Sequence, residues 1–91
     1  MNNFSDLYQT FEDFYNSFFR GNEVEFLYNG NRFCIFPKYN SSKRVIGVFV
    51  GKAYDEQEIF CASKEELYKA SLGDSSLGEA IEKIKIVWNN I

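Results

Sequence analysis

Large apolar residues near the N-terminus recur every three or four positions, which is the spacing of one face of a helix. Ser5 is placed to cap this helix, and Gly21 is placed to end it. We therefore predict a helix over residues 6–20. Its apolar stripe consists of Leu7, Phe11, Phe14 and Phe18.

After this helix the apolar period changes to two, which is the alternation of a half-buried β-strand. We predict strands over residues 23–28 and 31–39. Asn29 and Gly30 lie between them, and an Asn-Gly pair favours a two-residue type I′ turn because both residues accept positive φ. The segment is therefore predicted to be a β-hairpin.

A two-residue turn also determines which residues of the two strands face each other. Phe26 is expected opposite Phe33, and Val24 opposite Ile35, on the side of the ribbon that forms the core. Pro37 has no backbone N–H to donate, so the end of the second strand is expected at an edge or a bend.

Two further strands are expected over residues 44–53 and 57–62, the first of them rich in β-branched residues. Short connections join the four strands, which favours an antiparallel meander. Asp55, Glu56 and Glu58 lie in or beside the last connection, and we interpret them as residues of a solvated turn.

Two capping boxes predict two helices after the strands. Ser63 with Glu66 begins a short helix that ends at Gly73, and Ser76 with Glu79 begins a terminal helix. The terminal helix is expected to bury an apolar stripe that includes the single tryptophan. This stripe consists of Leu77, Ile81, Ile84, Trp88 and Ile91.

The expected fold is therefore α+β, in the order α-β-β-β-β-α-α. An N-terminal helix, a four-stranded antiparallel meander and two C-terminal helices would form two layers, with the helices on one face of the sheet. A chain of 91 residues is the size of one domain, so we assign residues 1–91 to a single domain.

Histidine is absent from the sequence, which removes the commonest general base and the commonest transition-metal ligand. We therefore expect a protein that is not an enzyme and that holds no metal ion and no cofactor. Cys34 and Cys61 form no Cys-x-x-Cys motif, and we interpret them as small, partly buried strand residues. Because there is no secretion signal and no run of about 20 apolar residues, we expect a cytoplasmic protein without a membrane span.

The net charge of −3 hides an uneven distribution. Residues 1–30 carry a net charge of −4, residues 31–52 carry +5 with no acid, and residues 53–91 carry −4. A mixture of basic and aromatic side chains is typical of nucleic-acid binding, but the acidic chain as a whole does not favour such a partner. The candidate nucleic-acid-binding residues are Lys38, Lys43, Arg44 and Lys52.

Aromatic residues make up 19% of the chain, and several have no place in the predicted core stripes. Tyr8, Tyr15 and Phe19 fall on an adjoining face of the first helix, near Glu12 and Asp13. An exposed patch of rings and acids is typical of a protein interface. A helix packed deeply against the sheet would instead bury the same rings in the core, and the sequence leaves both interpretations open.

Two segments carry a resemblance to a loose group of short bacterial proteins of unknown role. The segment Glu23–Gly30 (EVEFLYNG) is similar to their E-x-E-F-x-Y-N-G hairpin. The segment Gly73–Glu79 (GDSSLGE) resembles their D-G-x-S-L-x-E helix start, without the glycine after the aspartate. These motifs are a turn and two caps, so the resemblance implies no functional residue. In size and charge the chain is also similar to immunity proteins of bacterial toxin systems, which mask the basic site of a nuclease.

These observations favour a non-enzymatic protein-binding module, most concretely an immunity-type inhibitor or regulator that docks on a basic partner. Electrostatic complementarity would direct the association, and a few buried rings would provide the affinity. One alternative is a small nucleic-acid-binding module that uses the basic segment 38–52. Another is a homodimer whose exposed rings form the subunit interface.

Overall fold

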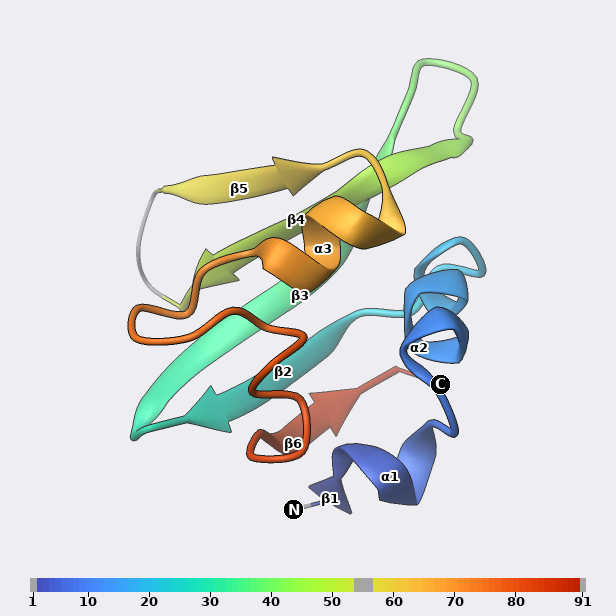
Figure 1. The fold of residues 1–91 in the computed structure, drawn as a ribbon. Coiled ribbons are helices and arrows are strands. Elements are labelled where there is room, and N and C mark those ends of the chain that lie inside the picture. The colour runs from blue at the N-terminus through green and yellow to red at the C-terminus, as the bar shows by residue number, and fades with distance from the viewer. Residues whose placement is uncertain (1, 54–56, 91) are drawn as a thin grey trace.

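A computed structural model describes residues 2–53 and 57–90. Over these residues the chain forms one antiparallel sheet of six strands, and three short helices lie on one of its faces (Figure 1). The strands are β1 (Asn2–Asn3), β2 (Val24–Tyr28), β3 (Asn31–Tyr39), β4 (Val45–Lys52), β5 (Glu58–Cys61) and β6 (Lys85–Asn89). The helices are α1 (Phe4–Leu7), α2 (Phe11–Phe18) and α3 (Lys64–Lys69).

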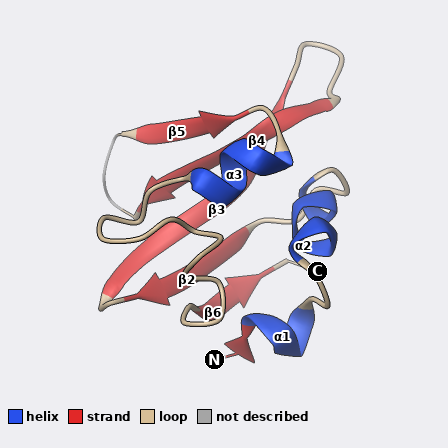
Figure 2. Ribbon diagram, viewed as in Figure 1, coloured by secondary structure: helices blue, strands red, loops and turns tan. Residues whose placement is uncertain are grey.

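The strand order β1-β6-β2-β3-β4-β5 corrects the expected fold class. Strands β2 to β5 are neighbours in chain order, but the sheet continues on the other side of β2 with β6 and β1. To reach that side, the chain passes from α3 across the helix-bearing face of the sheet and enters β6 beside β2 (Figure 2). The predicted four-stranded meander followed by two helices is therefore wrong.

The hairpin of β2 and β3 has the predicted turn and register. Asn29 and Gly30 have φ angles of 50° and 78°, as a type I′ turn requires. Phe26 pairs with Phe33 and Val24 pairs with Ile35, and all four are buried. Beyond Ile35 only β4 pairs with β3 among the described residues, so Pro37 lies where the β2 side of the strand is a local edge.

The predicted terminal helix is wrong, because its described residues, 76–90, form turns followed by a strand, and Ile91 of the predicted stripe lies outside the described residues. Ser76 does cap a turn, since its hydroxyl accepts a hydrogen bond from the Glu79 N–H at 3.3 Å. The chain does not continue as a helix, however, and residues 85–89 pair with β2 as β6. Ile84 and Ile86 are both buried, which is the alternation of a strand. Trp88 pairs with Glu25 and is 47% exposed, so its predicted burial is also wrong.

The predicted helix over residues 6–20 is divided into α1 and α2. Thr10 begins α2, because its hydroxyl accepts a hydrogen bond from the Asp13 N–H at 3.0 Å, whereas Asn3 rather than Ser5 caps α1. The break leaves Leu7 exposed. Gly21 follows α2 with a φ of 92°, which agrees with its predicted role at the helix end.

The core lies between the helix-bearing face of the sheet and the segments that cross it. Its largest fully buried side chains include Phe14 and Phe18 of α2, Phe26 of β2 and Leu67 of α3. The segment between α3 and β6, which crosses this face of the sheet, is hydrogen-bonded to the hairpin through Asp74. One carboxylate oxygen of Asp74 accepts a hydrogen bond from the Tyr28 hydroxyl at 2.8 Å, and the other accepts one from the Asn29 amide at 3.0 Å. The segments Glu23–Gly30 and Gly73–Glu79, which carry the resemblance to short bacterial proteins, are thus in direct contact.

Gly30→Val is expected to lower the free energy of unfolding by about 1–3 kcal/mol, because a β-branched residue resists positive φ. No atom lies within 4 Å of a Cβ built on Gly30, so steric contact adds nothing to this loss. Gly30→Asn is the control, since asparagine tolerates positive φ, and it should lose much less. Urea denaturation measures both, and equal stabilities of the two variants would contradict the assigned turn.

Trp88→Ala is expected to cost less than about 2 kcal/mol, below the ~3–5 kcal/mol typical of a buried tryptophan. Ile86→Ala in the same strand should cost about 2–5 kcal/mol, because Ile86 is 2% exposed. The native fluorescence of Trp88 should be readily quenched by acrylamide. A blue-shifted, protected emission would contradict the placement of Trp88 on the uncovered face.

Candidate functional site

Helix α2 positions most of the residues that the sequence singles out as a partner site. Phe14 and Phe18 are fully buried and hold the helix against the sheet. Phe11 and Glu12 lie at its start, and Phe19 follows its end. The two ends of α2 therefore present side chains on different surfaces.

The three rings of the predicted partner site have different environments. Tyr8 is half-buried against the core, and its hydroxyl accepts a hydrogen bond from the Asn22 amide at 2.7 Å. Burial raises the pKa of the Tyr8 hydroxyl. Tyr15 is also half-buried and packs edge-to-face against Phe19, with 5.0 Å between the ring centroids. Phe19 is 42% exposed, so it is the ring of the three that is most available to a partner.

Both acids of the predicted partner site are exposed, and among the described residues only Glu12 has an ion-pair partner on another helix. A carboxylate oxygen of Glu12 lies 3.6 Å from the Lys64 ammonium of α3. Asp13 lies in the first turn of α2, where a carboxylate interacts favourably with the helix dipole. The structure thus brings Glu12 to the boundary between α2 and α3.

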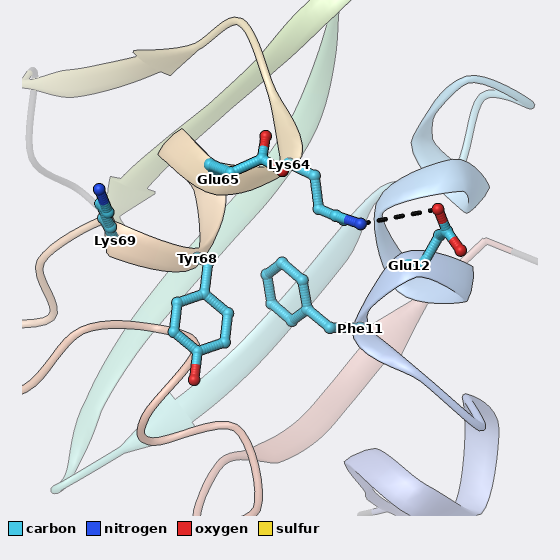
Figure 3. A pocket seen from close by; sticks show the side chains of 6 residues that line it. All are labelled: Phe11, Glu12, Lys64, Glu65, Tyr68 and Lys69. Atoms are coloured by element: carbon cyan, nitrogen blue, oxygen red, sulfur yellow. Dashed lines mark ion pairs between the residues drawn. The ribbon is translucent and has the colours of Figure 1, made fainter.

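A pocket of about 230 Å³ lies at this boundary, and Figure 3 shows the side chains that line it. Phe11 and Tyr68 form its apolar wall, with the ring centroids 5.2 Å apart and the planes at 74°. The Glu12–Lys64 pair lies above the two rings in the view, and the Tyr68 hydroxyl points away from the ion pair. We call this site the α2–α3 pocket, lined by Phe11, Glu12, Lys64, Glu65, Tyr68 and Lys69.

The acids of α3 also act on Tyr15 of α2, which lies outside the pocket lining. Burial raises the pKa of the Tyr15 hydroxyl, and the negative charges of Glu65 and Glu66 act in the same direction. Glu66 accepts a hydrogen bond from the Ala62 N–H at 2.6 Å and so also fixes the start of α3. Glu12 of α2 and Glu65 of α3, which lie far apart in the sequence, both line the pocket.

Sequence reasoning did not identify Lys64 and Tyr68 as site residues. The contact of Tyr68 with Phe11 exists only because α3 packs beside α2, and no local pattern reports that packing. Gly78 allows Tyr68 to take this position, because a Cβ at residue 78 would lie 2.1 Å from the Tyr68 ring. The close approach at Gly78 fixes the ring in its place beside the pocket.

The four candidate nucleic-acid-binding residues do not form one patch. Lys43 and Arg44 lie in the turn between β3 and β4, and Lys52 lies at the opposite end of β4. Lys38 lies on the face of the sheet away from the helices, with its ammonium 5.3 Å from the centre of the Phe49 ring. Only Lys43 and Arg44 of this set therefore share a site.

The face of the sheet away from the helices carries a row of three rings. Phe36 pairs with Phe49 and Phe49 pairs with Phe60, with centroid distances of 5.4 and 5.6 Å. Gly47 makes room for this row, because a Cβ there would lie 2.7 Å from the Phe60 ring. The row is a cross-strand packing feature of the sheet.

Cys34 lies on β3 and Cys61 on β5, with β4 between them, and the surroundings of both disfavour the thiolate. Cys61 is buried, and burial raises its pKa to about 11. Partial burial raises the pKa of Cys34 as well, and the carboxylate of Glu25 adds to the effect. A reactive thiol needs a lowered pKa, so this environment is the opposite of that of a nucleophile.

Residues 2–53 and 57–90 contain no group of three or more histidine, cysteine, aspartate or glutamate side chains that could hold a metal ion. Asp55 and Glu56 of the predicted solvated turn lie outside these residues. In the same part of the chain, no helix has the length and apolarity needed to cross a membrane.

Comparison with protein-family models, with curated proteins and with solved structures gives no match for this chain. The resemblance of its hairpin and Gly73–Glu79 segments to short bacterial proteins therefore stays a sequence-based expectation.

Cys61 is expected to resist alkylation in the native protein, because a pKa of about 11 leaves little thiolate near neutral pH. At about pH 8 the thiolate fraction should be on the order of a hundredfold below that of an unperturbed cysteine. Iodoacetamide labelling of a Cys34→Ser variant, followed by mass spectrometry, measures Cys61 alone. Labelling of native Cys61 at the rate found in urea would contradict its burial.

Proposed function

We propose that the protein is a non-enzymatic binding module for another protein, which inserts one apolar side chain into the α2–α3 pocket. The observation that carries this proposal is the pocket itself, with its wall formed by the Phe11 and Tyr68 rings. Its volume of about 230 Å³ is below the ~300–1,000 Å³ typical of small-molecule sites, and it suits a single side chain. Aromatic anchors in pockets of this kind provide most of the affinity of protein interfaces.

The charges around the pocket define the chemistry of the partner. The lining carries two acids, Glu12 and Glu65, and two lysines, Lys64 and Lys69, and Asp13 and Glu66 are further exposed acids on the same two helices. A docking segment with basic residues on both sides of its apolar anchor would complement this rim. An immunity-type inhibitor that covers a basic site of its target is one form of this function.

The ion pair at the mouth of the pocket does not prevent entry of a side chain. Glu12 and Lys64 have side chains that are 67% and 39% exposed. Exposed pairs contribute only about 0–1 kcal/mol, so a partner can separate them at little cost. A basic side chain of the partner would then take the place of Lys64 beside Glu12.

Short synthetic peptides test the proposal. One has a central phenylalanine flanked by lysine and arginine, a second has alanine in place of phenylalanine, and a third has the phenylalanine flanked by glutamate. The first should shift the amide resonances of residues 11–12 and 64–69 in ¹H–¹⁵N spectra. The other two should bind at least about tenfold more weakly, a difference of about 1.4 kcal/mol.

Glu12→Lys combined with Glu65→Lys should weaken binding of the first peptide by about tenfold or more. The matched control is Glu58→Lys combined with Glu25→Lys, which reverses the same number of charges on the face of the sheet away from the helices, where Glu58 pairs with Gly51 and Glu25 pairs with Cys34. Equal binding of all three peptides, or shifts confined to another surface, would overturn the proposal. Concentration-dependent self-association that shifts the same resonances without peptide would overturn it in favour of a homodimer.

A further inference from the structure

A second hollow, of about 470 Å³, lies between the end of α2 and the β3–β4 turn. Its volume is within the ~300–1,000 Å³ typical of small-molecule sites. We call it the basic cleft, and its lining includes Phe19, Arg20, Gly21, Tyr39, Lys43 and Arg44. It brings together Phe19, the most exposed ring of the predicted partner site, and Lys43 and Arg44, two of the candidate nucleic-acid-binding residues.

The charge of the basic cleft has one sign. Arg20, Lys43 and Arg44 line it, and no lining residue is acidic. Arg20 comes from the chain after α2, and the other two come from the β3–β4 turn. Three cationic side chains from two segments that are separate in the sequence thus surround one hollow, although the whole chain has a net charge of −3. Such an arrangement favours an anionic ligand.

The turn that carries two of these cations has a defined conformation. The side-chain oxygen of Asn40 accepts hydrogen bonds from the Ser42 N–H at 2.9 Å and the Arg44 N–H at 3.0 Å. The Asn40 N–H in turn donates to the Arg44 carbonyl at 2.9 Å. Lys43 has a φ of 62°, a conformation that these hydrogen bonds support. The cations are therefore presented on a closed turn rather than on an extended loop.

Two rings offer stacking surfaces in the same cleft. Phe19 is 42% exposed and Tyr39 is 50% exposed. Gly21 lies beside Tyr39, since a Cβ at Gly21 would be in ordinary contact with the Tyr39 hydroxyl oxygen, at 3.7 Å. A planar group that enters the cleft would contact ring surface, and an attached anionic group would reach the cations of the turn.

We infer that the basic cleft binds a nucleotide unit, with the base stacked on Phe19 or Tyr39 and the phosphate beside Lys43 and Arg44. The phosphate belongs at the turn because the C-terminus of α2, at the other side of the cleft, carries the negative end of the helix dipole. The same chemistry is offered by a free mononucleotide and by a single-stranded nucleic acid. The inference is independent of the α2–α3 pocket, which uses other residues.

The probes are inorganic phosphate, AMP and an oligothymidylate of about eight nucleotides, a length within the site sizes of single-strand binders. AMP and the oligonucleotide should shift the amide resonances of residues 19–21 and 39–45. Affinity for the oligonucleotide should fall roughly 20-fold between about 50 and 200 mM salt. This slope corresponds to about three phosphates of a single strand, in contact with Arg20, Lys43 and Arg44. Tighter binding of the oligonucleotide than of AMP would identify nucleic acid as the source of the nucleotide, and equal binding would identify the free nucleotide.

Lys43→Gln combined with Arg44→Gln should weaken binding of both nucleotide probes at least about tenfold. Phe19→Leu and Tyr39→Leu should together weaken it at least about fivefold, the lower end of the stacking contribution. Lys52→Gln combined with Lys83→Gln removes the same charge outside the cleft and should leave binding nearly unchanged. Circular dichroism checks that each variant is folded.

Three results would overturn the inference. The first is the absence of shifts in the cleft with AMP and with the oligonucleotide. The second is equal loss of affinity in the cleft variant and in the Lys52/Lys83 control, which would show that only the overall charge matters. The third is binding of inorganic phosphate as tight as that of AMP with no effect of the ring variants, which would reduce the cleft to a simple anion site.

Discussion

The conformation of the Asn29-Gly30 turn determines which side chains of the central hairpin face the helices. With both residues at positive φ, Phe26 stacks on Phe33 inside the core, at a centroid distance of 5.4 Å. A shift of one residue would move this pair to the opposite face and bring Glu25 and Cys34 into the core instead. The helices would then lose the surface against which Phe14 and Phe18 pack. Every later element depends on this register, because β4 pairs with β3 and β6 pairs with β2.

A chain of 91 residues buries a smaller fraction of its surface than a larger domain does, and this one covers only one face of its sheet. The helices and the crossing segment all lie on one face, where they bury the hairpin (Figure 1). On the other face Phe36, Phe49 and Phe60 form a row across β3, β4 and β5, in which each ring packs against the next. Recesses form where separate segments meet on the covered side, and both pockets discussed above border α2.

Local patterns were enough to predict the hairpin, the two following strands and the start of α3, because each depends on residues close in the sequence. The predicted end of this helix at Gly73 is wrong, because α3 ends at Lys69. The terminal helix was mispredicted because Leu77, Ile81 and Ile84 satisfy helical spacing. The alternation of Lys83, Ile84, Lys85 and Ile86 favours a strand equally well. The strand forms because residues 85–89 pair with the side of β2 that faces away from β3, and a local pattern does not report this pairing. The candidate site was predicted in part: Glu12 and Phe19 lie at pockets, but Tyr68 and Arg20 join them through tertiary packing alone.

The charges that stabilise α2 also give its two ends opposite signs of charge. Glu12 and Asp13 lie in its first turn and interact favourably with the positive end of the helix dipole, whereas Arg20 lies just beyond its negative end. An eight-residue helix is about 12 Å long, so an acidic and a basic surface lie within one short element. Because Phe14 and Phe18 are fully buried between these ends, the helix cannot shift toward one ligand without disturbing the core. A protein segment at the α2–α3 pocket and a nucleotide at the basic cleft would therefore bind independently, and only a partner large enough to span α2 would contact both surfaces.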